Sequence, residues 1–209
     1  MKTHFSILLI IFLIGCQKTN NTPSVEFFPN KVGDHWVYKY SPTLSPEIDT
    51  GLINVDIVGQ TTLPDGEKAK IWATRYSNDP NNIDTSYVVS VASLVKIYNG
   101  DICLPCTTQM PGERRRYILP FVVNNKWFSA LVFGDTTRVL SELNLSTPAG
   151  IFKNTFQLSK TIGYAVNSYT IDTIFLSPNI GMTKFIQEEY SLGPFPGNGI
   201  WKLAGYSLK

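Results

Sequence analysis

A period of two in hydrophobicity runs through most of the chain and limits its fold more than any other feature. In the stretch GLINVDIVG, Ile53, Val55 and Ile57 alternate with polar residues, so one face of a strand is apolar and the other polar. Similar stretches are HWVYKY, KAKIWATRY, TSYVVSVASLVKIY, GIFKNTFQLSK, NSYTIDTIFLS and MTKFIQEEY. Because they are also rich in β-branched and aromatic residues, the sequence predicts an all-β protein.

Turn signals separate these strands at short intervals. The segments PDG, NDPNN, YNGD, TPAG and SPNIG lie between them, and such residues favour tight reversals of the chain. We therefore expect antiparallel sheets, arranged as a sandwich or as a curved half-barrel.

Two halves of the chain resemble each other. FFPNKVGDHWVY at 27–38 aligns without gaps on ILPFVVNNKWFS at 118–129, LPDGEKAKIW at 63–72 resembles TPAGIFKNTF at 147–156, and SLVKIY at 93–98 resembles GMTKFI at 181–186. The offsets of 91, 84 and 88 residues are nearly constant, as two diverged copies of one β unit would give. The halves would span 27–105 and 115–209; chance similarity between amphipathic strands is the alternative.

The first 15 residues have the order of a secretory signal peptide. Lys2 precedes an apolar run at 5–14, which is too short to span a bilayer because a helix needs about 20 residues for that. The run ends in Leu13-Ile14-Gly15-Cys16, which resembles a bacterial lipobox. The resemblance implies cleavage before Cys16 and acylation of that residue, and two or three acyl chains anchor a protein stably.

Residues 16–26 then form the lipidated cysteine and a flexible polar tether, and residues 27–209 form the β-rich domain. Position 17 is glutamine, whereas aspartate there resembles an inner-membrane retention signal. The tether also lacks an acidic cluster similar to the surface-export signal of Bacteroidota lipoproteins. We expect the outer membrane, with the periplasmic face favoured over the cell surface.

The mature chain has few residues for metal or acid–base chemistry. Cleavage leaves His35 as its only histidine and two cysteines besides Cys16, so we expect no metal site, no cofactor and no catalytic residue. Loss of Lys2 reduces the 18 basic residues to 17 against 16 acidic ones. This balance excludes nucleic acid as an expected partner, because phosphate binding needs a basic excess.

The motif Cys103-Leu104-Pro105-Cys106 is open to several chemistries. A C-x-x-C motif can form a redox pair, half of a zinc site or a small disulfide loop. No helix pattern follows it and no further ligands lie nearby. In an oxidising compartment we expect a structural disulfide; free thiols, redox chemistry and metal binding are the alternatives.

Four residues are candidate ligand contacts. Trp72 lies on a mixed face of its strand, together with Thr74. Arg114 and Arg116 would share one strand face and could bind a phosphate or sugar acid, a solvated strand entry being the alternative. Phe195 lies in the Gly/Pro-rich loop SLGPFPGNG at 191–199, where it could plug or contact a cavity mouth.

Three longer patterns resemble those of Bacteroidota lipoproteins. They are F-P-x-x-x-G-[DN]-x-W-x-Y-x-Y at 28–40, T-P-A-G-x-F-K-N at 147–154 and an aromatic strand near 201–208. The likeness spans most of the mature chain, although Asn124 replaces the glycine in the second copy. It implies a β-rich envelope lipoprotein and no particular activity.

We therefore expect a non-enzymatic envelope protein that meets the membrane through its N-terminal lipid and binds a hydrophobic ligand in a β-sheet cavity. A protein-interaction or assembly module of the outer membrane is the first alternative, and a glycan-binding module is the second. An apolar cavity would favour the hydrophobic ligand, and an exposed apolar sheet edge would favour the protein-interaction module. A surface row of aromatic side chains would favour the glycan-binding module.

Overall fold

The computed structural model describes residues 25–42, 51–99, 113–128, 135–165, 168–190 and 199–209. All regular secondary structure in these ranges is β, which confirms the all-β prediction. Cys16, Cys103, Cys106 and Phe195 lie outside the described residues, and so does the side chain of Arg114. Within the described ranges, no helix has the length and apolarity needed to cross a membrane.

A single antiparallel sheet of twelve strands is built from these residues. The first six strands are β1 (His35–Pro42), β2 (Leu52–Thr62), β3 (Lys68–Tyr76), β4 (Asp79–Val91), β5 (Leu94–Asn99) and β6 (Glu113–Ile118). The second six are β7 (Lys126–Phe128), β8 (Thr136–Thr147), β9 (Gly150–Ala165), β10 (Ser168–Ser177), β11 (Gly181–Tyr190) and β12 (Gly199–Ser207). Within each set of six, every strand pairs with the strand that follows it in the chain. The two sets are joined where β1 pairs with β12, and β6 and β7 form the two edges of the sheet. The fold is thus one curved sheet and not a sandwich.

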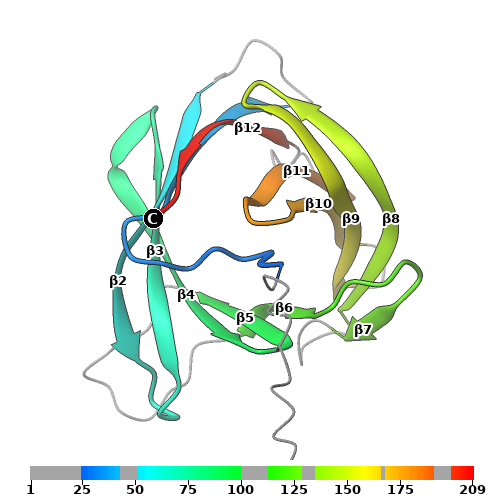
Figure 1. Ribbon diagram of the computed structural model, residues 1–209, viewed down its shortest axis with the longest axis horizontal. Coiled ribbons are helices and arrows are strands. Elements are labelled where there is room, and N and C mark those ends of the chain that lie inside the picture. The colour runs from blue at the N-terminus through cyan, green and yellow to red at the C-terminus, as the bar shows by residue number, and fades with distance from the viewer. Residues whose placement is uncertain (1–24, 43–50, 100–112, 129–134, 166–167, 191–198) are drawn as a thin grey trace, which may run out of the picture.

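The sheet curves until it is nearly closed into a barrel (Figure 1). The side-chain Nε1 of Trp127 in β7 donates a hydrogen bond of 2.7 Å to the backbone carbonyl of Arg116 in β6. This bond links the two edge strands, which share no ladder. The apolar residues Ile53, Val55 and Ile57 are 6 % exposed or less, so the period of two seen in the sequence separates the inside of the barrel from its outside.

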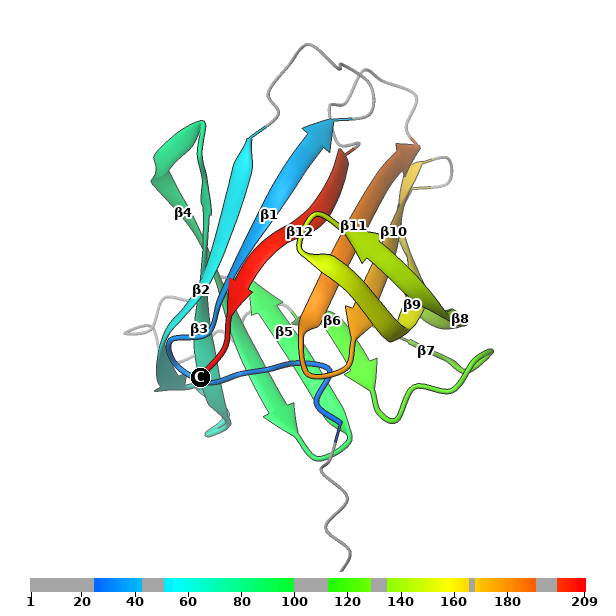
Figure 2. The same ribbon diagram turned by 45° about the horizontal axis from the view of Figure 1, so that its top comes forward.

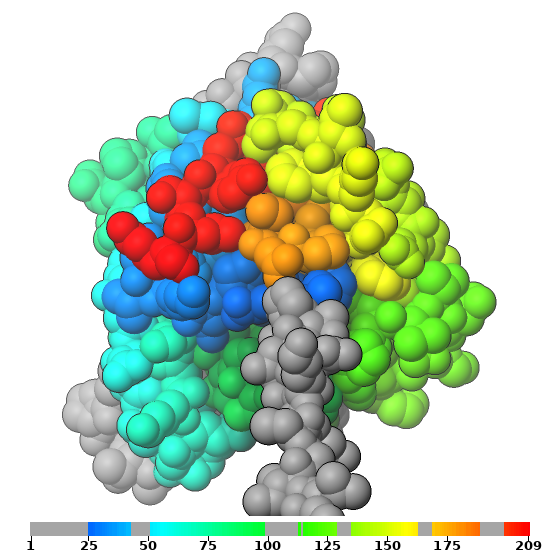
Figure 3. All heavy atoms as spheres, in the orientation of Figure 1, coloured from blue at the N-terminus to red at the C-terminus, as the bar shows by residue number. Residues whose placement is uncertain are grey.

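One end of the barrel is filled by residues 25–34 and by the turn between β10 and β11. Phe27 and Phe28 are both buried, and the ring of Phe27 lies 5.0 Å from that of Phe121. The backbone amide of Asn179 donates to the carbonyl of Glu26 at 2.6 Å. In Figure 3 this end is covered by the N-terminal segment (blue), the β10–β11 turn (orange) and the C-terminal strand (red). We call it the closed end.

Gly181 begins β11 at the closed end, with φ at +92°. A side chain there would be strained, and a Cβ atom would lie 3.4 Å from Pro29 Cδ. We expect Gly181→Ala to lower the free energy of unfolding by about 1–2 kcal/mol in urea denaturation. Gly205→Ala is the matched control, because nothing lies within 4 Å of a Cβ at that position. An equal loss in both variants would contradict the explanation.

The two halves of the sheet begin with the same turn. The amide of Gly33 donates to Ile57 at 2.8 Å, and the amide of Asn124 donates to Val139 at 2.9 Å. Both donors have positive φ, +96° and +74°, and asparagine tolerates this conformation better than most residues do. The turn therefore keeps its geometry although Asn124 replaces the glycine. Descent of both halves from one unit stays a prediction.

Candidate ligand-binding cavity

The barrel encloses a cavity of about 750 Å³. Strands β1 to β6 and β10 to β12 supply its walls, and Phe28 of the N-terminal segment lines it from the closed end. The exposed residues Asn82, Ile83 and Asp84 line its other side, beside the turn between β3 and β4. Figure 2 shows this turn at the end opposite the C-terminus. We call this end the mouth.

The part of the cavity nearest the closed end is aromatic and apolar. Trp36 and Trp72 stack with their ring centroids 5.3 Å apart. The Nε1 atom of Trp36 donates to the carbonyl of Ile180 at 2.7 Å, and that of Trp72 donates to Asn30 Oδ1 at 2.8 Å. The polar atom of each indole already has a partner. Trp36 is 1 % exposed and packs within the wall, whereas the partly buried ring of Trp72 offers apolar surface to a ligand. The partly buried Met182 extends this surface, and the buried side chains of Leu176, Ile174 and Tyr117 pack in the same wall.

Trp201 is the centre of a second aromatic group farther from the closed end. Its ring centroid lies 5.5 Å from Phe185, 6.1 Å from Tyr38 and 6.4 Å from Tyr76. The hydroxyl of Tyr38 donates to the carbonyl of Met182 at 2.9 Å. Burial strongly raises the pKa of this hydroxyl, so Tyr38 remains neutral at physiological pH.

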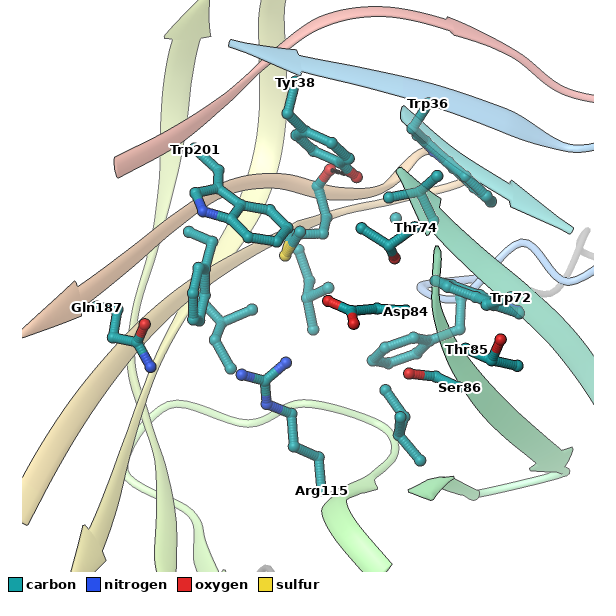
Figure 4. A pocket seen from close by; sticks show the side chains of 18 of the residues that line it. Trp36, Tyr38, Trp72, Thr74, Asp84, Thr85, Ser86, Arg115, Gln187 and Trp201 are labelled. Carbon is teal, nitrogen blue, oxygen red and sulfur yellow. Dashed lines mark hydrogen bonds between the residues drawn. The ribbon is translucent and has the colours of Figure 1, made fainter. Parts of the chain in front are cut away.

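Polar side chains converge toward the mouth. Figure 4 shows Asp84, Arg115 and Gln187 pointing into the cavity from different walls. In the sheet register, Asp84 lies opposite Thr74, on the mouth side of the pair formed by Trp72 and Ser86. The cavity therefore changes from apolar to polar between its closed end and its mouth.

Arg115 is the cavity-lining residue with the most defined charge contacts. Its Nη2 atom lies 2.9 Å from Oδ2 of Asp172, which is fully buried. Its guanidinium also lies 5.1 Å from the centroid of the Phe185 ring, a cation–π distance. Burial of Asp172 is tolerated because a cation and a hydrogen bond compensate its charge. The other oxygen of Asp172 has no hydrogen-bond partner among the described residues.

A second buried charge pair joins β9 to the residue that precedes β8. Lys160 is 2 % exposed, and its Nζ lies 3.6 Å from Oδ2 of Asp135. In the register between β9 and β10, Lys160 lies opposite Asp172. Burial and the positive charge of Arg115 lower the pKa of Lys160 from 10.5 to about 8, although Asp135 and Asp172 favour its charged form.

The free energy of unfolding should therefore rise as the pH rises above the lowered pKa of Lys160, about 8. Between pH 8 and 10.5 the unfolded chain holds the Lys160 proton and the folded chain releases it, so the free energy of unfolding increases with pH. We expect about 2 kcal/mol between pH 8 and about pH 10. Urea denaturation of the wild type and of Lys160→Met isolates the effect, because the variant should lack this rise. The same slope in both proteins would contradict the assignment.

The candidate contacts from the sequence fall in different places. Trp72 lines the cavity. Arg116 does not: its guanidinium forms two hydrogen bonds, of 2.7 and 2.6 Å, with the carboxylate of Glu113. Arg115, which was not among the candidates from the sequence, lines the cavity. Alternation along β6 separates Arg115 from Arg116, but it does not tell which face is inside.

His35 lies away from the cavity. Its Nδ1 atom is 2.7 Å from Oδ1 of Asp56, whose other oxygen is 2.8 Å from Nη1 of Arg75. The described part of the chain also contains no group of three or more metal-ligating side chains.

Two solved structures align with most of this chain. A protein from Bacteroides fragilis, described as exported and as having a YmcC-like fold, aligns with a TM-score of 0.54 at 12% sequence identity, over 88% of this chain and 99% of that one. A protein from Parabacteroides distasonis, described as a lipoprotein, aligns with a TM-score of 0.46 at 14% identity over the same shares. No protein-family model and no curated protein matches the sequence. The first alignment shows that this chain shares the fold described as YmcC-like.

Proposed function

We propose that this chain is a lipid-anchored envelope protein that binds an amphipathic ligand inside its barrel and catalyses no reaction. The observation that carries the proposal is the cavity of about 750 Å³ with an aromatic closed end and a polar mouth. Small-molecule sites have volumes of about 300–1,000 Å³ and combine apolar walls with a few placed polar groups.

The change from apolar to polar walls along the cavity favours one orientation of the ligand. Its apolar part would contact the partly buried Trp72 and Met182, where burial of apolar surface provides most of the binding free energy. Its polar part would meet Asp84 and Gln187 near the mouth, where it can also keep contact with water. This refines the expected hydrophobic ligand into one with a hydrogen-bonding end.

The envelope location rests on the lipobox at Leu13-Ile14-Gly15-Cys16. The fold likeness to a protein described as exported supports it. The non-enzymatic character rests on the position of His35, which is outside the cavity and paired with Asp56. Outer-membrane attachment on the periplasmic face remains part of the proposal.

A glycan is the second candidate ligand. Asn82, Asp84, Thr85 and Ser86 give one wall a run of hydrogen-bonding groups, and Trp201 offers an aromatic ring across the cavity. Sugars bind through this combination of stacking and hydrogen bonds, whereas an amphiphile also needs the deep apolar region.

A cavity-filling substitution tests the proposal. Ser86 is partly buried and lines the cavity on β4, directly beside its register partner Trp72 on β3. Ser86→Trp should therefore occupy ligand space. We expect it to weaken binding of a fatty acid carrying an anthroyloxy fluorophore by about tenfold or more, or about 1.4 kcal/mol.

Ser146→Trp is the matched control, because Ser146 is exposed on β8 and outside the cavity. It should bind the probe as the wild type does. Equal binding by both variants, or no binding by the wild type, would contradict the amphipathic ligand. Binding of an oligosaccharide that Ser86→Trp alone abolishes would favour the glycan instead.

A further inference from the structure

We infer that the cavity opens away from the membrane that holds the lipid anchor, so that the ligand is exchanged through the aqueous space and is not drawn directly from that membrane. The inference rests on the proposed function and on acylation of Cys16. It adds a direction of exchange, which the presence of a cavity alone does not give.

The tether meets the barrel at a point fixed by hydrogen bonds and by two buried rings. Backbone and side-chain atoms of Asn179 hydrogen-bond to Glu26 at 2.6 and 3.0 Å. The next two residues, Phe27 and Phe28, are 7 % and 6 % exposed and fill the closed end. The chain therefore leaves the barrel at Val25, on the side opposite the mouth.

The tether has a limited reach. Val25 follows Cys16 by nine residues, which span at most about 30 Å when fully extended. The eight residues of β1 run for about 26 Å along the strand, which corresponds to about 20 Å of barrel height because barrel strands tilt by about 35–45°. The segment of residues 25–34 enters near the barrel centre (Figure 1), so the tether must also cross the barrel's radius before it can pass along the outside. Bringing the mouth onto the same membrane would therefore need an almost fully extended tether, whereas the closed end can reach that membrane with the tether relaxed.

The surface of the closed end combines exposed apolar side chains with basic ones. Val25 and Val32 belong to the segment of residues 25–34 and are 54 and 49 % exposed. Ile151, 74 % exposed, lies at the start of β9 beside this end, where the ring of the next residue, Phe152, lies 6.3 Å from that of Tyr206. Lys31 lies there too, with its Nζ 2.9 Å from the carbonyl oxygen of Lys209. Apolar side chains beside lysines suit a surface that faces lipid headgroups.

Energy transfer between the protein and the membrane tests the orientation. The full-length acylated protein is placed in phospholipid vesicles that contain an acceptor-labelled lipid. A donor fluorophore is attached through an azide-bearing amino acid at position 151, or at position 81, which is exposed at the mouth end of β4. We expect transfer at least about twice as efficient from position 151, because the height of the barrel separates the two sites.

Equal transfer from the two positions, or higher transfer from position 81, would overturn the inference. Cys16→Ala is the control for acylation and should show no transfer from either site. The measurement needs no ligand, so its result is independent of probe binding. Failure of the anthroyloxy probe to bind would overturn the proposed function and leave the orientation standing.

Discussion

Arg115→Leu is expected to destabilise the protein by about 3–5 kcal/mol, since it leaves the buried carboxylate of Asp172 without its hydrogen-bonded cation. Arg115 lies 2.9 Å from Asp172, which is fully buried. The loss should appear as a lower midpoint of urea denaturation with an unchanged slope. It should also weaken probe binding, because Arg115 lines the cavity.

The double variant Arg115→Leu with Asp172→Leu separates charge pairing from packing. Replacement of both members of a buried pair by apolar residues is often neutral or stabilising, so the double variant should regain most of the stability lost by Arg115→Leu. Arg116→Leu is a control on the same strand, because its pair with Glu113 is partly exposed and such pairs contribute about 0–1 kcal/mol. Failure of the double variant to recover would show that the loss comes from something other than removal of the cation beside Asp172.

Phe27→Ala should have an effect of similar size. The ring is 7 % exposed and lies 5.0 Å from Phe121 and 5.5 Å from Phe156. Truncation of a buried phenylalanine costs about 3–5 kcal/mol, through lost burial and the cavity left behind. Chemical denaturation measures the loss, and limited proteolysis should show earlier cleavage near the N-terminal segment.

Val25→Ala is the matched control for Phe27→Ala. Val25 is 54 % exposed and precedes the residues that enter the barrel, so its truncation should change stability by about 0.5 kcal/mol or less. If Phe27→Ala were as mild as Val25→Ala, the N-terminal segment would not be part of the core, and the fixed exit of the tether would lose its basis.

The strands were predictable from the sequence because their information is local. Ile53, Val55 and Ile57 alternate with polar residues and are all buried, as a half-buried strand requires. The Pro-x-Gly turns before β3 and β9 end in Gly66 and Gly150, both with positive φ. Such turns depend on a few adjacent residues, so the sequence pattern was enough to place them.

The closure of the sheet and the filling of its end were not predictable. The edge strands β6 and β7 are joined by the hydrogen bond from Trp127 to the carbonyl of Arg116. No local sequence pattern predicts this contact. Phe27 and Phe28 are adjacent and both buried, so they follow neither a strand nor a helix period. Their burial depends on the space left inside a barrel whose curvature is set by all twelve strands.

The cavity residues show why the site was only partly predictable. Alternation assigned Arg115 and Arg116 to opposite faces, but the face with the cavity can carry charge as readily as the face in solvent. Trp72 was identifiable, because a large aromatic residue on a polar strand face indicates a surface that is neither core nor fully solvated. Asp84 and Gln187 gave no such signal and required the assembled barrel.

Native mass spectrometry of the full-length protein, gently extracted from its own envelope, tests the central claim most directly. The account predicts a mass beyond the chain and its covalent lipid, an adduct that is lost on denaturation and is absent from Ser86→Trp but present in Ser146→Trp. A wild-type protein without an adduct, or an adduct that Ser86→Trp retains, would contradict a ligand bound inside the barrel.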